Sequence, residues 1–312
     1  MKTSAILALA LLLCACTKPP LEPIKIGINP WPGYEFLYLA QEKGFYAELG
    51  VSVKIIEYGS LNDVRRGYER GNLDVMTSTL IEVLQVKNYS NRDPQIFLMT
   101  DFSYGGDVII AKDPIKNLAD LKGKRIAVDT TSLPIFILAR ALEKANLQLS
   151  DVNVIPIEQS SLVRAYTEGS IDAVVTYPPV SVQLERFPTT NTIFTSREIP
   201  GEVLDVVSAE ADILSSRPDD FKKIRLAWDM ALKYSAEHPE EANRIMGARE
   251  GITVDEFRDA LNDVKTLHLK DQKKYAPQLK LALTHVKNTL VELGVLDNSV
   301  SSDCCVSDLL LE

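Results

Sequence analysis

The 312-residue sequence is poor in residues on which several common functions depend. Its three His are His238, His268 and His285, and no two of them have the spacing of a metal-binding motif. Neither a His-based zinc site nor a Ser-His-Asp triad is therefore indicated. Lys and Arg number 34 against 43 Asp and Glu, so the net charge is −9. Without a basic block the chain is a poor candidate for nucleic-acid binding, which requires clustered Lys and Arg.

Glycine and proline, with 15 and 16 residues, are too few for a collagen-like or low-complexity chain. Hydrophobic residues make up 46% and charged residues 25%, the balance of an ordinary globular protein. The length predicts about two domains. Among the four cysteines, Cys304 and Cys305 are adjacent. We expect them to be free or to pair between chains, because a bond between neighbours strains the intervening peptide.

The first residues are typical of an export signal. Lys2 precedes an apolar run over residues 5–15, which is shorter than the about 17–25 residues of a transmembrane helix. The sequence Leu-Cys-Ala-Cys at 13–16 resembles the bacterial lipoprotein signal, with Cys16 as the acylated residue; a plain cleaved signal is the alternative. Three prolines follow within residues 19–23. We predict a signal peptide over 1–15 and an extended tether over 16–23.

Beyond the tether, β-rich runs alternate with helical patterns, which predicts α/β layers. Residues 24–28 and 51–58 are predicted strands, and the chain is predicted to be helical from Pro218 to about Leu293. The pattern divides into two blocks. We predict a first lobe over 24–100 and 208–312, with a second lobe, residues 101–207, inserted into it.

In open α/β sheets, ligands bind beyond the carboxyl ends of the strands. Six such strand ends carry polar residues, several of them hydroxyls at a helix start, where free N–H groups suit an oxygen of a ligand. Each could equally be a structural helix cap. The segments are 29–35, 77–79, 101–107, 129–132, 158–161 and 177–179.

Aromatic and acidic residues distinguish these ends. Trp31 and Tyr177 lie next to prolines that hold the backbone rigid, so each ring is placed either to stack on a ligand or to cover the core. The ends contain Asp and Glu but no Lys or Arg, and Glu202 and Asp205 follow on the return segment. Carboxylates in a shielded cleft favour an amine or a protonated heterocycle, because an unpaired buried charge is costly.

Several stretches resemble the extracytoplasmic solute-binding proteins of ABC importers, in the group for nitrate, taurine, aliphatic sulfonates and thiamine-pyrimidine precursors. The resemblance lies in LYLAQEKGFY at 37–46, GVSV at 50–53 and GNLDV at 71–75. It continues in LADLKGKRIA at 118–127, and in GSIDA at 169–173 followed by YPP at 177–179. The order and spacing of these stretches cover Ile24 to about Leu296.

The resemblance implies the α/β type II periplasmic-binding-protein fold, in which two α/β lobes joined by a two-segment hinge close over a solute. It also implies docking on a membrane permease, with no catalysis, cofactor or metal. Eight ligand-binding residues follow from family position, and the strand-end argument adds Tyr34, Tyr104, Thr131 and Glu202. The eight are Trp31, Ser78, Thr79, Asp101, Gly106, Asp107, Ser132 and Tyr177.

We therefore expect a monomeric, lipid-anchored, extracytoplasmic substrate-binding component of an ABC importer on the periplasmic side of the membrane. An amine-bearing or pyrimidine-type solute is favoured over a sulfonate or nitrate. One alternative is a ligand-sensing subunit of a membrane signalling protein. A second is an enzyme of thiamine-pyrimidine synthesis, although no His lies between Ile24 and Glu237 and no nucleophile–base pair is visible.

Overall fold

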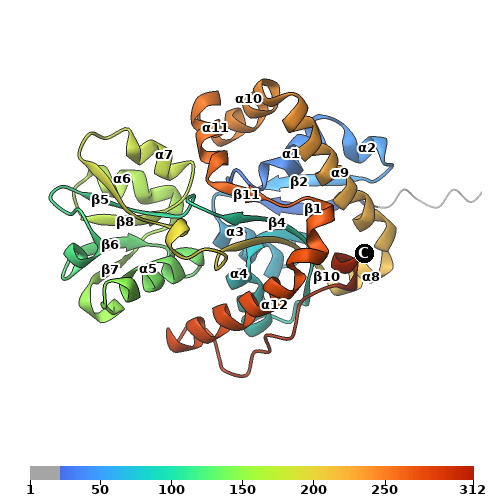
Figure 1. The fold of residues 1–312 in the computed structure, drawn as a ribbon. Helices are drawn as coiled ribbons and strands as arrows, with labels where there is room; N and C mark the ends of the chain where they lie inside the picture. The colour runs from blue at the N-terminus through green and yellow to red at the C-terminus, as the bar shows by residue number, and fades with distance from the viewer. Residues whose placement is uncertain (1–21) are drawn as a thin grey trace, which may run out of the picture.

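The computed structural model describes residues 22–312, which form two α/β lobes side by side (Figure 1). The predicted signal peptide, Cys16 and most of the tether lie outside the described residues. Lobe 1 is built on a six-stranded sheet with the order β11-β4-β10-β3-β1-β2. Its strands are β1 (Ile24–Ile28), β2 (Val53–Glu57), β3 (Val75–Thr79), β4 (Pro94–Ser103), β10 (Leu204–Glu210) and β11 (Val264–Thr266).

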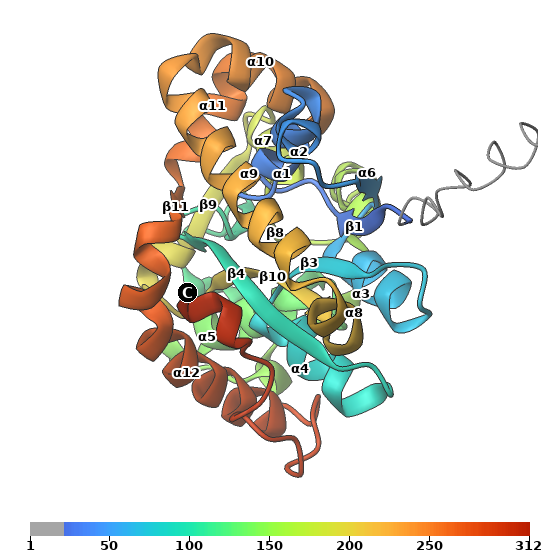
Figure 2. The ribbon, with the colours of Figure 1, turned by 90° about the vertical axis from the view of Figure 1, so that its right-hand side faces the viewer.

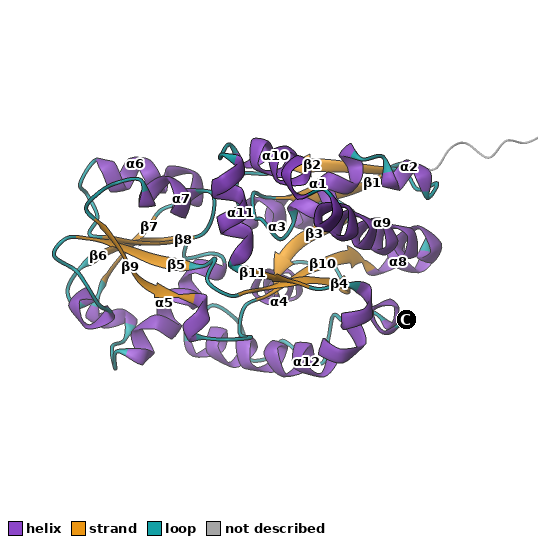
Figure 3. Cartoon of the chain, turned by 45° about the horizontal axis from the view of Figure 1, so that its top comes forward, coloured by secondary structure: helices purple, strands orange, loops and turns teal. Residues whose placement is uncertain are grey.

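Helices cover both faces of this sheet (Figure 3), and its central strands β1, β3 and β4 are therefore largely buried on both sides. The α-helices of lobe 1 are α1 (Glu35–Glu42), α2 (Phe45–Glu48), α3 (Leu61–Glu69), α4 (Leu80–Tyr89), α8 (Ala211–Ser216), α9 (Pro218–Glu237), α10 (Pro239–Glu250), α11 (Val254–Asn262) and α12 (Leu269–Glu292). Within residues 22–312, no helix combines the length and apolar character needed to cross a membrane.

Lobe 2 has a five-stranded sheet with the order β7-β6-β8-β5-β9. Its elements are β5 (Val108–Lys112), β6 (Arg125–Val128), α5 (Leu133–Lys144), β7 (Asn153–Pro156), α6 (Leu162–Thr167), β8 (Ala173–Thr176), α7 (Val180–Glu185) and β9 (Thr190–Thr195). The chain crosses between the lobes twice, after β4 and before β10. These strands run to Ser103 and from Leu204, so residues 101–103 and 204–207 belong to the sheet of lobe 1.

Two strands lie where the sequence predicts none. β9 is an edge strand that pairs with β5, and its sequence TNTIFT lacks the apolar alternation of a half-buried strand. β11 is three residues long, within the stretch predicted to be helical, and pairs with the end of β4. Both strands depend on a long-range partner, which local patterns do not reveal.

The prediction that Cys304 and Cys305 are free or pair between chains is wrong, because they form a disulfide with each other. The chain bends at Cys305, where φ is 72°, and the Cys305 carbonyl accepts a hydrogen bond from the Ile96 amide at 2.6 Å. The following residue, Val306, pairs with Ile96 in parallel, so the C-terminal segment covers part of the outer edge of β4 (Figure 2). This docking fixes the bend that brings the two sulfurs together.

The buried core is continuous across the two lobes. One cluster of buried apolar side chains includes Trp31 and Tyr34 from lobe 1 and Leu133 and Tyr177 from lobe 2. The lobes are therefore closed on each other, and the residues at their junction belong at once to the core and to the interlobe cleft.

Candidate functional site

Strand direction brings the polar strand ends together at one cleft. β1, β3 and β4 run parallel to one another and end at the same edge of the lobe 1 sheet, where antiparallel β10 begins. The register places Asp205 of β10 opposite both Thr79 of β3 and Asp101 of β4. In lobe 2, β6 and β8 end where β5 begins, so Asp107 lies near Tyr177 at the facing edge.

A small cavity of about 10 Å³ lies between these two edges. This is about the space that one buried water molecule needs, so a solute enters only when the lobes move apart. None of the residues that line it is Lys, Arg or His. The lining residues are Asn29, Trp31, Tyr34, Leu61, Asp107, Leu133, Tyr177 and Asp205.

Two aromatic rings from opposite lobes form one wall of the cavity. The rings of Trp31 and Tyr177 meet edge to face, with centroids 6.1 Å apart and planes at 82°. Trp31 also donates from Nε1 to Asp101 Oδ1 at 3.3 Å. A Cβ atom at Gly106 would lie 2.5 Å from Trp31 Cη2, so only glycine leaves room for this ring at the crossing between lobes.

Three buried aspartates dominate the polar character of the site. Asp101, Asp107 and Asp205 are each at most 3% exposed. Asp205 Oδ1 accepts a hydrogen bond from the Tyr34 hydroxyl. The Oδ2 atoms of all three aspartates and Oδ1 of Asn29 are buried without a hydrogen-bond partner among the described residues. Leaving such acceptors unpaired is costly, so the cleft is short of hydrogen-bond donors and of positive charge.

Burial shifts the ionisation of these groups. It raises the pKa of Asp107 to about 7, and the nearby Asp101 and Glu82 carboxylates add to the rise while Ser103 opposes it. Burial and then the charge of Asp101 raise the pKa of Asp205 well above its usual value. Burial and then Asp205 raise the pKa of the Tyr34 hydroxyl in the same way. The two aspartates therefore keep their protons to a higher pH than a free aspartate does.

The predicted hydroxyl residues serve several different contacts. Thr79 caps α4 through its own side chain, and Ser78 Oγ is buried without a partner among residues 22–312. Ser132 donates to Glu82 Oε1 at 2.6 Å across the interface between the lobes. Thr131 is exposed and donates from both its amide and its hydroxyl to Asp129 Oδ1, in a local turn.

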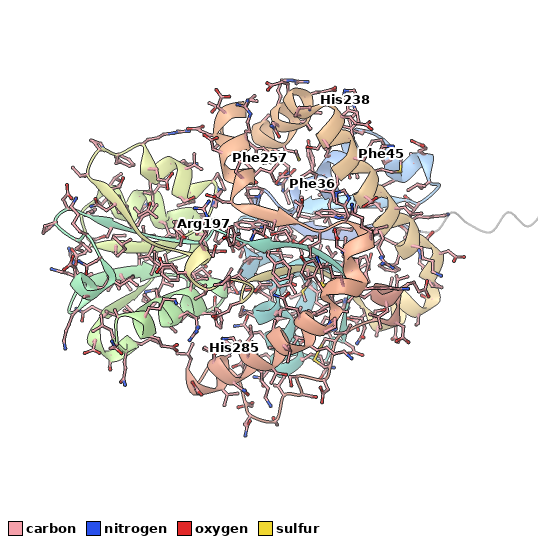
Figure 4. The ribbon with its side chains drawn as sticks, in the orientation of Figure 1. Phe36, Phe45, Arg197, His238, Phe257 and His285 are labelled. Atoms are coloured by element: carbon pink, nitrogen blue, oxygen red, sulfur yellow. A yellow bond between two sulfur atoms is a disulfide. The ribbon has the colours of Figure 1, made fainter. Side chains whose placement is uncertain are left out.

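Tyr104 and Glu202 do not line the cavity, and each contacts other residues. Lys265 Nζ sits 3.2 Å from the centroid of the Tyr104 ring, and Arg197, at the junction of the lobes in Figure 4, approaches the same ring. Glu202 accepts from Arg140 Nε of α5 at 2.7 Å and lies 3.1 Å from His285 Nε2 of α12. It therefore links the lobes through an ion pair and lines no part of the cavity.

Sequence reasoning did not select four of the lining residues, Asn29, Leu61, Leu133 and Asp205. Asp205 becomes a site residue only because β10 pairs with β3 and β4. No local sequence pattern predicts this pairing. Glu82 was also missed, although Thr-x-x-Glu at 79–82 is the signature of a capping box. Its second contact, to the other lobe, is decided by the tertiary structure.

The arrangement offers binding groups rather than reactive ones. The lining residues include no Ser, Cys or His that could act as a nucleophile or shuttle a proton near neutral pH. Across residues 22–312, no group of three or more His, Cys, Asp or Glu is placed to hold a metal ion.

The architecture identifies the structural class of the protein. The chain forms two α/β lobes, passes between them twice, and closes them over a polar cleft. This is the fold of periplasmic binding proteins. The structure is similar to that of the alkanesulfonate-binding protein SsuA from Xanthomonas axonopodis pv. citri bound to MOPS, with a TM-score of 0.77 and 15% identity over 90% of this chain and 96% of that one.

Sequence comparison then gives the family. The NMT1/THI5 like family matches residues 31–242, so the chain belongs to it. A binding protein of Brucella abortus (strain 2308) is 29% identical over 143 residues, which span 44% of each of the two proteins. A Bacillus subtilis (strain 168) protein that carries the name of an aliphatic sulfonates-binding protein is 25% identical over 80% of this chain and 72% of its own length.

Proposed function

We propose that this protein is the solute-binding component of an ABC importer and that its solute is a small amine or an aminopyrimidine. Family membership and fold support the first part, since the cited relatives carry the names of binding proteins. An extracytoplasmic location agrees with them. Lipid anchoring through Cys16 and an extended tether belong to the same proposal and rest on the sequence alone.

The single observation that carries the ligand class is the set of four unpaired acceptor atoms. Asn29 and Asp107 each bury one oxygen that no donor of the described residues reaches, and the Oδ2 atoms of Asp101 and Asp205 have at most a proton shared between these two carboxyls. An ammonium group supplies three N–H donors and one positive charge, and an aminopyrimidine supplies two N–H donors with a ring that takes up a proton. Either ligand would pair several of these oxygens at once.

The same oxygens argue against an anion, although the named relatives include sulfonate-binding proteins. A sulfonate or nitrate presents only acceptors, and the cavity lining offers it no Lys or Arg. An aspartate of the cleft that keeps its proton offers an anion at most one hydroxyl donor, and an aspartate that ionises repels the anion strongly in a water-poor site. The relatives share the fold with this chain, and their cleft residues need not carry the same charge.

Closure of the two lobes provides the mechanism. A solute that touches Trp31 of lobe 1 and Tyr177 of lobe 2 stabilises the closed form by its differential affinity for that form. A membrane permease would then recognise the closed shape. One acyl chain on Cys16 would bind the membrane only marginally, so stable anchoring needs the several chains of a bacterial lipoprotein.

Thermal-shift screening of the purified protein tests the proposal. We expect 4-aminopyrimidine or small alkylamines to raise the Tm, while methanesulfonate and nitrate leave it unchanged, because a bound ligand stabilises by mass action. Asp205→Asn should weaken the response, and the exposed Asp303→Asn should preserve it. A shift with methanesulfonate and none with amines would refute the assigned ligand class.

A further inference from the structure

Glu82 of α4 is the one cleft carboxylate described here whose two oxygens are both fully engaged. It is entirely buried. Oε2 accepts from the amide and hydroxyl of Thr79, at 2.9 and 2.6 Å. Oε1 accepts from the Ser132 hydroxyl at 2.6 Å and from the Leu133 amide at 3.1 Å. Four donors, two from each lobe, thus converge on a single side chain.

The donors of lobe 2 belong to the start of α5. Ser132 is the N-cap of this 12-residue helix, and its hydroxyl bonds Glu82 instead of capping a backbone amide of α5. The free N–H groups and the dipole at a helix start attract an anion. Glu82 reaches across the cleft and supplies that anion from the other lobe.

A purely local role does not account for this geometry. The capping box of α4 uses Oε2 and Thr79 and would be complete without the other oxygen. Oε1 has both of its partners on the facing lobe. The neighbouring aspartates differ, because the Oδ2 atoms of Asp101, Asp107 and Asp205 are buried without a hydrogen-bond donor among the described residues.

We propose that Glu82 is a specificity-determining residue that serves as the built-in counter-ion of the cleft. It fills the anion position at the start of α5, so the lobes can close without an acidic group from the solute. The same carboxylate uses up the donors that a sulfonate or nitrate would need, and it repels them. The inference rests on the proposed solute-binding function and explains how a family that includes sulfonate binders can yield a cleft for cations.

The decisive experiment removes the carboxylate and returns it in solution. Glu82→Ala leaves a gap beside four donors, and acetate and methanesulfonate are the probes, with chloride at matched ionic strength as the reference salt. We expect either probe to raise the Tm of Glu82→Ala by several degrees. Neither should stabilise the wild-type protein or Glu48→Ala, a control at an exposed position. Equal responses of all three proteins would overturn the proposal.

A second variant covers the case in which Glu82→Ala does not fold. Glu82→Gln keeps the size of the side chain but removes the charge and turns an NH₂ group toward one pair of donors. We expect a lower Tm than for Glu48→Gln and a larger radius of gyration in small-angle X-ray scattering of the ligand-free protein. A variant as stable and compact as the wild type would show that the charge is not needed, which contradicts the proposal.

The two proposals fail in different ways. If amines do not stabilise the wild-type protein but acetate rescues Glu82→Ala, the ligand class is wrong and the counter-ion role of Glu82 stands. If amines bind and acetate rescues nothing, the ligand class stands and the role of Glu82 is refuted.

Discussion

Replacing Asp107 by Asn should stabilise the ligand-free protein at neutral and alkaline pH. Asp107 is 2% exposed, and its Oδ2 has no partner among the described residues. Burial raises its pKa from 3.8 to about 7, which means that the folded protein disfavours the charged form. Asparagine has almost the same shape, carries no charge, and can donate to the neighbouring carboxylates.

The magnitude and its sign follow from proton linkage. Between these two pKa values the folded state holds a proton that the unfolded state has released, so stability declines as pH rises through this range. Each tenfold difference in proton affinity corresponds to about 1.4 kcal/mol, so the rise from 3.8 to about 7 predicts a loss on the order of 4 kcal/mol by pH 8. Below pH 4 the charge is absent and Asp107→Asn should have little effect.

Urea unfolding at intervals between pH 4 and pH 8 measures this difference directly. The wild type should lose stability over the range, and Asp107→Asn should lose less, with the gap widest at pH 8. Asp303→Asn, at an exposed position, serves as the control and should follow the wild type. If Asp107→Asn is no more stable than the wild type at pH 8, the unpaired carboxylate does not cost what its burial implies.

Three further outcomes can be measured. Trp31→Ala should weaken binding of whichever solute raises the Tm, since the ring forms one wall of the cavity, and calorimetric titration that finds unchanged affinity would limit Trp31 to a packing role. Gly106→Ala forces that ring to move and should lower both affinity and stability, the latter by about 1–3 kcal/mol; equal Tm values would contradict this. Reducing the bond between Cys304 and Cys305 should change the Tm little, because it closes a loop of only two residues, and a large drop would refute this reasoning.

Much of the architecture could be predicted because it depends on local pattern. Alternating β-rich and helical runs predicted two α/β lobes, and the order of motifs from 37 to 179 predicted the binding-protein fold, which the structure and the family match confirm. The ends of parallel strands meet at one edge by geometry alone. That rule predicts Trp31 and Tyr34 at one sheet edge and Asp107 and Tyr177 at another, and closure of the lobes then brings the two edges around one cavity.

The excess of acidic over basic residues in the cleft is also visible in the sequence. The predicted strand ends carried acidic residues and no basic ones, and the cavity lining has the same imbalance. Composition cannot show, however, which carboxylates find donors. Glu202 pairs with Arg140 and His285, whereas Asp107 is left with an unpaired oxygen.

Only the tertiary structure decided which segments distant in sequence contact each other. The register of β10 sets Asp205 beside Asp101, closure of the lobes delivers Glu82 to the start of α5, and docking of the C-terminal segment on β4 joins Cys304 to Cys305. Local propensity is a property of a few neighbouring residues. The partner of a buried charge is chosen by strand pairing and by the meeting of two lobes, so it is known only once the whole chain has folded.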